Sequence, residues 1–201
     1  MKMRMWIAVV AAVALCQMVS ANLLTNPGFE TTDTGLPGWE QADWYVGHGG
    51  DAHSGTNGMA YWVPNGRGNG DYYVALQSVP VVGGVSYDAS MWLRTVSYNT
   101  SEAFMEVVFQ DSTGSWIGQS GTTPVGGSTD YTQYSLNALA APAAAVTAMV
   151  RAVVHTTGAT TDNAWYTFDD FSFDAVPEPG TFALFGLGLL GFLRLRRKMS
   201  K

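Results

Sequence analysis

Residues 146–154 read VTAMVRAVV, and small or branched apolar side chains stand at every even-numbered position of this stretch. A two-residue period places alternate side chains on opposite faces of a β-strand, so the stretch predicts a strand with one buried face. The same alternation runs through residues 85–94 and 103–110. Four shorter segments of similar composition are further predicted strands: 58–63, 72–79, 131–137 and 166–173.

The segments between these strands have the composition of turns. Asp111 to Gly114 and the pair Gly83-Gly84 separate neighbouring strands, as hairpin turns do. No stretch of the domain has the 3.6-residue period of an amphipathic helix, and Pro142 interrupts the alanine-rich residues 138–145, which predict a loop or a single helical turn. The pattern therefore predicts an all-β fold, an antiparallel β-sandwich or jelly roll.

The N-terminus has the three parts of a secretory signal. Lys2 and Arg4 precede an uncharged run over residues 6–16, and the small residues Val19 to Ala21 follow. We expect a signal helix over residues 1–21, removed by signal peptidase after Ala21. An N-terminal membrane anchor is the alternative, but the run is shorter than the roughly 20 residues that span a bilayer.

Charge and cysteine content exclude several classes of function. The only cysteine, Cys16, lies in the signal, so the mature chain has neither a disulfide framework nor a thiol nucleophile. From Asn22 to Pro179, three basic residues stand against all 16 acidic ones, which gives 3 − 16 = −13 against −6 for the whole chain. Such an acidic surface repels phosphate backbones and excludes nucleic acid as a partner. Residues 22–175 have the length of one domain.

The C-terminus, residues 176–201, is also tripartite. A proline-rich segment over residues 176–179 precedes an apolar run over residues 182–193, which can enter a membrane as a short helix. A basic end that favours the cytoplasmic side follows: Arg194, Arg196, Arg197 and Lys198. Twelve helical residues span about 18 Å of a hydrocarbon core about 30 Å thick, which favours transient residence in the membrane. An ordinary tail anchor and a buried core helix are the alternatives.

This order of parts resembles the PEP-CTERM sorting signal of Gram-negative bacteria. The sorting motif itself is Val176, Pro177, Glu178 and Pro179. The resemblance implies recognition by an exosortase, a membrane transpeptidase that removes the hydrophobic tail, and a producer of exopolysaccharide or biofilm matrix. It therefore implies a periplasmic domain held transiently at the inner membrane and then delivered to the cell surface or the extracellular matrix.

Landmarks of the middle region resemble the galactose-binding-like jelly roll of CenC-type carbohydrate-binding modules. They are the residues 22–30, 37–39, 52–55, 77–93 and 168–171. The resemblance implies a structural calcium that joins the first and last strands through Glu30 and Asp169, with backbone carbonyls of residues 53–55 as further ligands. Strand alternation places Asp169 on the core-facing side with Phe171, where a carboxylate needs a partner. A pair of solvated acids is the alternative.

Aromatic residues are the best candidates for ligand binding, because flat rings stack on sugar faces while neighbouring polar groups bond the hydroxyls. We expect a glycan-binding face that includes Tyr45, Trp62, Trp92 and Trp116. Core packing of the same rings is the alternative, since sandwiches also bury Trp and Tyr.

Catalytic motifs are missing from the sequence. The acids are scattered through turns, no Gly-x-Ser-x-Gly elbow occurs, and a transition-metal site at His48, Asp51 and His53 has no further ligand nearby in sequence. We therefore expect a non-catalytic surface or matrix protein that binds, or is embedded in, exopolysaccharide. The alternatives are a purely structural surface protein without a ligand and a glycan-active enzyme.

Overall fold

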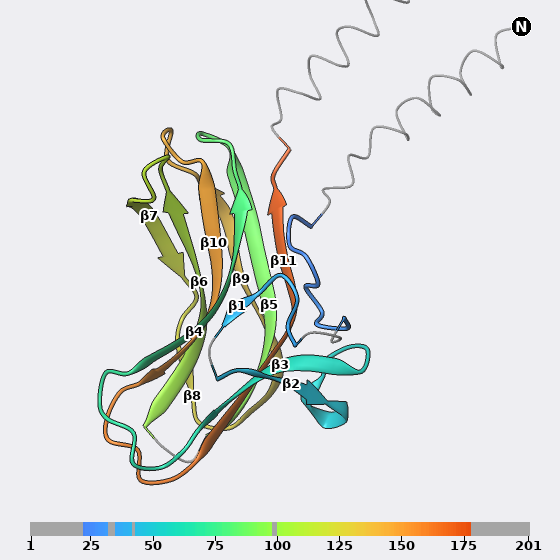
Figure 1. The fold of residues 1–201 in the computed structure, drawn as a ribbon, viewed down its shortest axis with the longest axis vertical. Helices are drawn as coiled ribbons and strands as arrows, with labels where there is room; N and C mark the ends of the chain where they lie inside the picture. Colours follow the sequence, from blue (N-terminus) through green and yellow to red (C-terminus); the bar gives the residue numbers. More distant parts are fainter. Residues whose placement is uncertain (1–21, 32–34, 42, 98–99, 178–201) are drawn as a thin grey trace, which may run out of the picture. The chain divides into compact units, whose positions relative to one another are not determined.

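Residues 147–154 lie in the central strand of one of two antiparallel sheets (Figure 1). The computed structural model describes residues 22–31, 35–41, 43–97 and 100–177. The expected signal helix, Glu178, Pro179, the apolar run and the basic end lie outside the described residues. Among the described residues, no helix has the length and apolar character that a membrane span requires.

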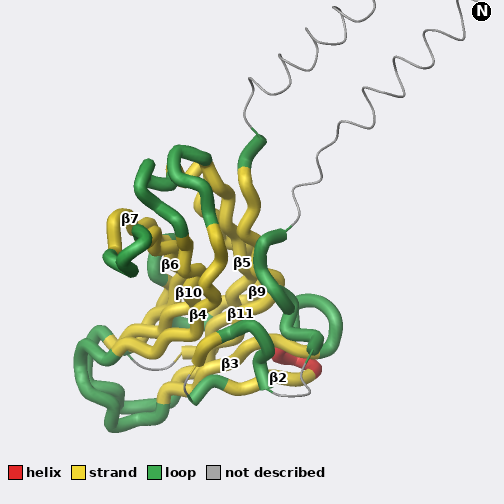
Figure 2. Tube along the Cα trace, turned by 45° about the horizontal axis from the view of Figure 1, so that its top comes forward, coloured by secondary structure: helices red, strands yellow, loops and turns green. Residues whose placement is uncertain are grey.

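Eleven strands and one 3-10 helix occur in the described part of the chain, and Figure 2 shows the helical turn beside β2. The elements are β1 (Glu40–Gln41), β2 (Tyr45–His48), η1 (Gly49–Asp51), β3 (Asn57–Val63), β4 (Tyr72–Pro80), β5 (Ser86–Ser97), β6 (Ser101–Gln110), β7 (Trp116–Gly121), β8 (Val125–Gly126), β9 (Thr129–Ala140), β10 (Thr147–Thr156) and β11 (Ala164–Ala175). All the predicted strands are present; most extend a few residues further at their ends, while β5 and β10 begin one residue later than predicted.

The strands form two sheets. Sheet A has the order β1-β4-β10-β6-β7, with β8 paired to β6, and sheet B has the order β2-β3-β11-β5-β9. Every pairing between these strands is antiparallel. The predicted all-β antiparallel sandwich is therefore confirmed, and consecutive strands repeatedly alternate between the sheets as in a jelly roll.

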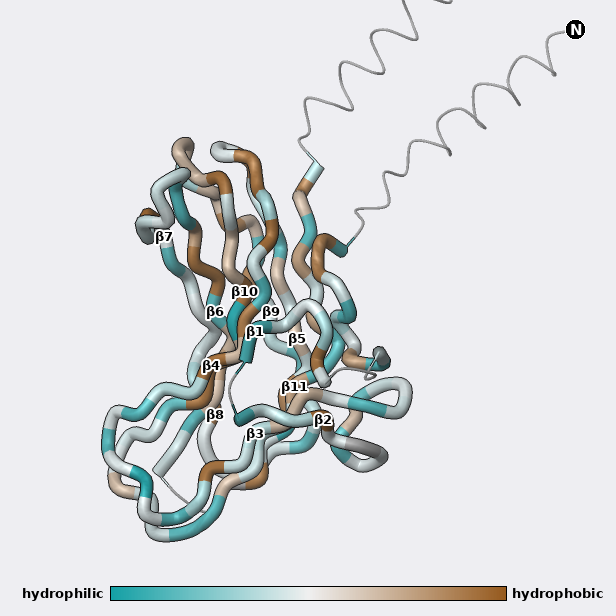
Figure 3. Tube along the Cα trace, in the orientation of Figure 1, coloured by the Kyte–Doolittle hydropathy of each residue, from teal (hydrophilic) through white to brown (hydrophobic). Residues whose placement is uncertain are grey.

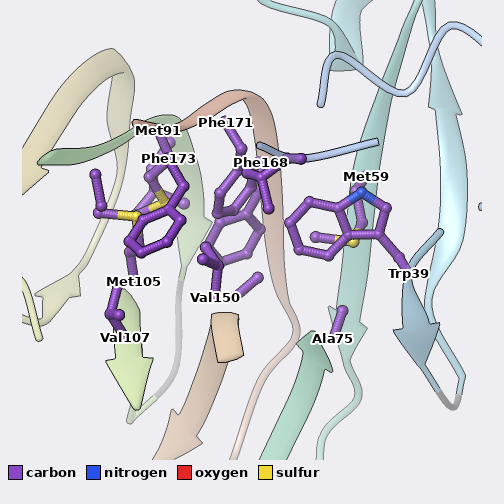
Figure 4. Packing of buried hydrophobic residues seen from close by; sticks show 14 of the residues in the cluster. Trp39, Met59, Ala75, Met91, Met105, Val107, Val150, Phe168, Phe171 and Phe173 are labelled. Carbon is purple, nitrogen blue, oxygen red and sulfur yellow. The ribbon is translucent and has the colours of Figure 1, made fainter. Parts of the chain in front are cut away.

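The inner faces of both sheets supply one core, as the alternation predicts. Ala148, Val150, Ala152 and Val154 of β10 are all buried, whereas Val146 lies just before the strand and is exposed. From sheet B, aromatic and sulfur-containing side chains meet them (Figure 4). Figure 3 shows hydrophobic residues concentrated along the strands, while the loops that join them are mostly hydrophilic.

The first described residues close the domain against its last strand. The Leu23 amide donates to the Phe173 carbonyl (2.9 Å), and the Asn22 side chain bonds the backbone of Phe171 and Phe173 (2.8 and 3.1 Å). Residues 22–175 form one compact unit, and the core found among the described residues runs from Leu24 to Phe173. Because it contains this core, the unit has what a domain needs to fold by itself.

The alternation expected around Asp169 is wrong. Asp169 pairs with Trp92, and the register shifts by one residue between Asp169 and Ser172. Asp170, with a φ of 46°, is the extra residue of this β-bulge. Because a one-residue shift moves every later side chain to the opposite face, Phe171 reaches the core while Asp169 stays on the outer face with Trp92.

Candidate functional site

The structure divides the four predicted glycan-binding aromatics between the two sheets. Trp116 begins β7 at the edge of sheet A, whereas Tyr45, Trp62 and Trp92 lie on β2, β3 and β5 of sheet B. Trp116 and Trp62 are 55% and 49% exposed, while Tyr45 and Trp92 are half-buried. The four residues therefore do not form one surface.

On the outer face of sheet A, Trp116 is joined to a buried polar network that sequence reasoning missed. Arg151 of β10 lies opposite Glu106 of β6, and its guanidinium donates to Oε2 of that carboxylate. Gln119 of β7 donates to the other oxygen of Glu106. The Arg151 guanidinium also lies over the Trp116 ring, 5.1 Å from its centroid, which is a cation–π contact.

Burial fixes this network in place. The side chains of Arg151 and Glu106 are only 14% and 9% exposed, so the ion pair lies in a low dielectric and is little screened by salt. The two hydrogen bonds to Glu106 hold its carboxylate in one orientation beside the half-exposed ring of Trp116. The network therefore presents a fixed aromatic ring next to fixed donors and acceptors.

A second aromatic group lies further along the same face. Tyr72 of β4 stacks on His155 of β10, with ring centroids 4.1 Å apart and an interplanar angle of 17°. His155 Nδ1 lies 3.1 Å from the Glu102 carboxylate, and Tyr72 is 60% exposed. Since His155 follows Arg151 by four residues, the two groups lie about 13 Å apart along the strand. Val153, between them, is buried and gives the surface an apolar floor.

On the outer face of sheet B, Trp62 is the cross-strand partner of Trp165 on β11. The Trp165 ring packs against Tyr45, with centroids 5.1 Å apart at 60°. Burial of the Tyr45 phenol raises its pKa above the usual value, and the nearby Asp51 charge adds to the effect. The three rings thus lie on three adjacent strands, and the exposed Trp62 is on the middle one.

The ring of Trp92 is covered by a histidine. His53 stacks on it with centroids 3.8 Å apart and an interplanar angle of 12°, and the Tyr131 ring meets the edge of the same imidazole. His53 Nδ1 lies 2.7 Å from Asp170 Oδ2, which holds the imidazole there. The face of Trp92 on which His53 stacks is therefore closed to a sugar.

Asp169, predicted as a calcium ligand, lies fully buried beneath the loop between η1 and β3, which contains His53. Its Oδ2 accepts from the amides of His53 (2.8 Å) and Ser54 (3.1 Å), and its Oδ1 accepts from the Asp170 amide (2.7 Å). Burial raises the pKa of this carboxyl to about 6, and the three amide hydrogen bonds oppose the rise. The partner expected for the carboxylate is thus the loop backbone.

Glu30 binds the C-terminal end of the same loop. Its Oε1 accepts from the amides of Thr56 (2.9 Å) and Asn57 (3.0 Å). Gly55 lies between, with a φ of 63°, and a β-carbon there would collide with the Glu30 carboxylate. Glycine is therefore required at position 55 by both the backbone conformation and the space.

The two acids are oxygen donors of the type that calcium prefers, and both converge on one loop. Among the described residues, however, no three acidic, histidine or cysteine side chains group into a metal site. Lone pairs remain on both carboxylates after the amide hydrogen bonds, so calcium at Glu30 and Asp169 stays a prediction. Two of the residues considered above for a transition-metal site have other partners: His53 pairs with Asp170, and Asp51 lies 3.7 Å from Arg94.

Val176 and Pro177, the first half of the predicted sorting motif, directly follow β11. Residues 175–198 match the family described as the PEP-CTERM protein-sorting motif. Among curated proteins, none matches the chain at a significant level.

Several solved structures share the fold of the domain. TmCBM61, solved in complex with β-1,4-galactotriose, matches with a TM-score of 0.54 and 18% identity over 78% of this chain and 100% of its own. The CBM22-1 xylan-binding domain of Paenibacillus barcinonensis Xyn10C matches with a TM-score of 0.52 and 15% identity, over 79% and 97% of the chains.

A Stig cyclase of Fischerella sp. TAU, solved in complex with an indole compound, has a TM-score of 0.57 at 16% identity, over 79% and 98% of the chains. The same fold thus occurs in binding modules and in an enzyme, and fold alone leaves the activity open. The chain carries a PEP-CTERM protein-sorting motif behind a domain with the β-sandwich fold of carbohydrate-binding modules.

Proposed function

We propose that this chain is an exported, non-catalytic carbohydrate-binding protein, and that the outer face of sheet A is its binding surface. The observation that carries the proposal is the half-exposed Trp116 ring, supported by Arg151, which Glu106 and Gln119 hold in place. A sugar ring stacks its apolar face on an indole, while carboxylate, amide and guanidinium groups bond its hydroxyls.

Preorganisation supports this choice of face. Because Glu106 is already bound by Arg151 and Gln119, little side-chain entropy is lost when a ligand replaces surface water. Tyr72, stacked on His155 about 13 Å further along the strand, supplies a second ring for a chain of several sugar units.

Two carboxyl groups of this face are engaged in structural pairs, which favours binding over hydrolysis. A glycosidase needs one carboxyl group that donates a proton and another that activates water or attacks the sugar. Glu106 is paired with Arg151, and Glu102 lies against His155. The carboxyl group whose pKa rises to about 6, Asp169, lies on sheet B and is bound by three amides.

The two ends of the chain supply the route in this proposal. Signal peptidase removes residues 1–21, the C-terminal helix holds the domain on the periplasmic side of the inner membrane, and an exosortase recognises Val176 to Pro179. The domain then reaches the surface or matrix of a Gram-negative cell, where polysaccharide is its partner. A single structural calcium at Glu30 and Asp169 belongs to the same proposal.

Affinity electrophoresis tests the binding surface. The domain, residues 22–177, is run through gels that contain β-1,4-galactan, xylan or exopolysaccharide from the producing strain. We expect retardation on at least one polymer, weakened about 10-fold by Trp116→Ala, because an aromatic stacking contact is worth about 1.5 kcal/mol. The matched control, Val82→Ala, removes an exposed apolar side chain of the β4–β5 turn and should change nothing. Unretarded migration on every polymer would favour the purely structural alternative.

A further inference from the structure

The outer face of sheet B has the same kind of surface chemistry as the proposed site, on the opposite side of the sandwich. Trp62 and Trp165 are cross-strand partners, and Tyr45 packs on Trp165. Ala60 lies between Tyr45 and Thr167 in the register, and it is fully buried. A small side chain at this position lets the Tyr45 and Trp165 rings meet across β3, the strand that carries the exposed Trp62.

An arginine–carboxylate pair accompanies these rings, as one accompanies Trp116 on sheet A. Arg94 of β5 lies 3.7 Å from the Asp51 carboxylate and donates to the Gly50 carbonyl (2.5 Å). Asp51 is in turn close enough to Tyr45 to help raise the pKa of its phenol. Both sheets thus carry an exposed indole, a ring pair and an arginine–carboxylate pair, and on sheet B the carboxylate comes from η1.

Two polar atoms of these rings have no hydrogen-bond partner among the described residues: the Tyr45 hydroxyl and the Trp165 indole nitrogen. A buried polar group without a partner is energetically unfavourable. Both atoms are buried, but both rings belong to the outer face of the sheet, where Trp62 is exposed. Such unpaired atoms beside an exposed indole point to a polar ligand.

The occupant is an uncharged polysaccharide rather than a protein or a polyanion. The nearby charges are already paired, Arg94 with Asp51 and His53 with Asp170, and the net charge of the domain repels anions. A stable protein interface buries about 1,200–2,000 Å² with an apolar centre, whereas Trp62 is the one large, exposed apolar side chain that sheet B carries among the described residues.

We propose that Trp62, Trp165 and Tyr45 form a second carbohydrate-binding surface, so that one domain bridges two polysaccharide strands. The inference rests on the proposed function of sheet A, because the ligand class is the same. Two sites on opposite sheets cannot contact one short segment together, and the second binding event therefore recruits another segment or another strand. A bivalent monomer of this kind cross-links a polysaccharide matrix.

The test uses exopolysaccharide purified from the producing strain and four forms of the domain: wild type, Trp62→Ala, Trp116→Ala and the double variant. Affinity electrophoresis measures binding, and the viscosity of a dilute polymer solution measures cross-linking. Thermal unfolding confirms that each variant folds, which is expected because both indoles are half-exposed. Sedimentation confirms a monomer, so that dimerisation cannot imitate bivalence.

We expect the wild type to raise the viscosity at least 2-fold. Each single variant should still be retarded in the gel but should raise the viscosity much less at the same protein concentration, and the double variant should be the weakest in both assays. Loss of all binding in Trp116→Ala, or full cross-linking by monomeric Trp62→Ala, would overturn the second surface and leave the first intact. A wild type that migrates unretarded would overturn both.

Discussion

The buried carboxyl of Asp169 should make the domain more stable in mild acid than at neutral pH. Burial raises its folded-state pKa to about 6 from the ordinary value of 3.8. The native state therefore binds the proton more tightly than the unfolded chain, and stability rises as pH falls through 6. Lowering the pH from 7.5 to 5 should raise the ratio of native to unfolded protein about 10-fold through this one group. That change adds about 1.4 kcal/mol to the free energy of unfolding.

Urea unfolding of residues 22–177 at pH 7.5 and pH 5, with chelator present, measures this difference. Asp169→Asn keeps a carbonyl oxygen for the loop amides but cannot titrate. Its free energy of unfolding should therefore lack the rise of about 1.4 kcal/mol that the wild type shows between pH 7.5 and pH 5. Asp130→Asn, which removes an exposed acid of β9, is the matched control and should behave as the wild type. Identical pH dependence in wild type and Asp169→Asn would refute the effect of burial.

Three further predictions concern the core, the loop and the metal. Phe171→Ala removes a buried ring that packs 4.9 Å from Trp39, and the unfolding free energy should fall by about 3–5 kcal/mol in urea titration; a loss below 1 kcal/mol would contradict the packing. Gly55→Ala should cost about 1–3 kcal/mol, because position 55 has a positive φ and a β-carbon there collides with Glu30, whereas Gly66→Ala, with a positive φ but open space, should cost less. If calcium binds Glu30 and Asp169, millimolar calcium should raise the melting temperature of the wild type by several degrees, and Glu30→Gln should abolish the rise. An equal response in both proteins would exclude Glu30 as a ligand.

The sequence predicted the long strands because the core-facing side of each carries an apolar residue at every second position. The even-numbered positions of β10 and the odd-numbered positions of β6 are buried as the alternation requires. The short strands β1, β2, β7 and β8 were missed. β1, β2 and β7 lie at the edges of their sheets, and β2 and β7 mix glycine with polar residues. An edge strand with little buried surface has no two-residue period to detect.

The site was harder to predict than the fold. The four aromatics were identified by type, but their division between two sheets depends on pairings that no local pattern encodes. The bulge at Asp170 was missed because no glycine marks its positive φ. A usable signal did exist for the network on sheet A, since Arg151 and Glu106 are each a lone charge inside an apolar strand, and such a charge needs a partner nearby.

Isothermal titration of residues 22–177 with exopolysaccharide from the producing strain tests carbohydrate binding most directly. The account predicts saturable heat for the wild type, a binding constant about 10-fold weaker for Trp116→Ala, and no change for the exposed control Val82→Ala. No heat of binding in the wild type, with calcium and with chelator alike, would contradict it.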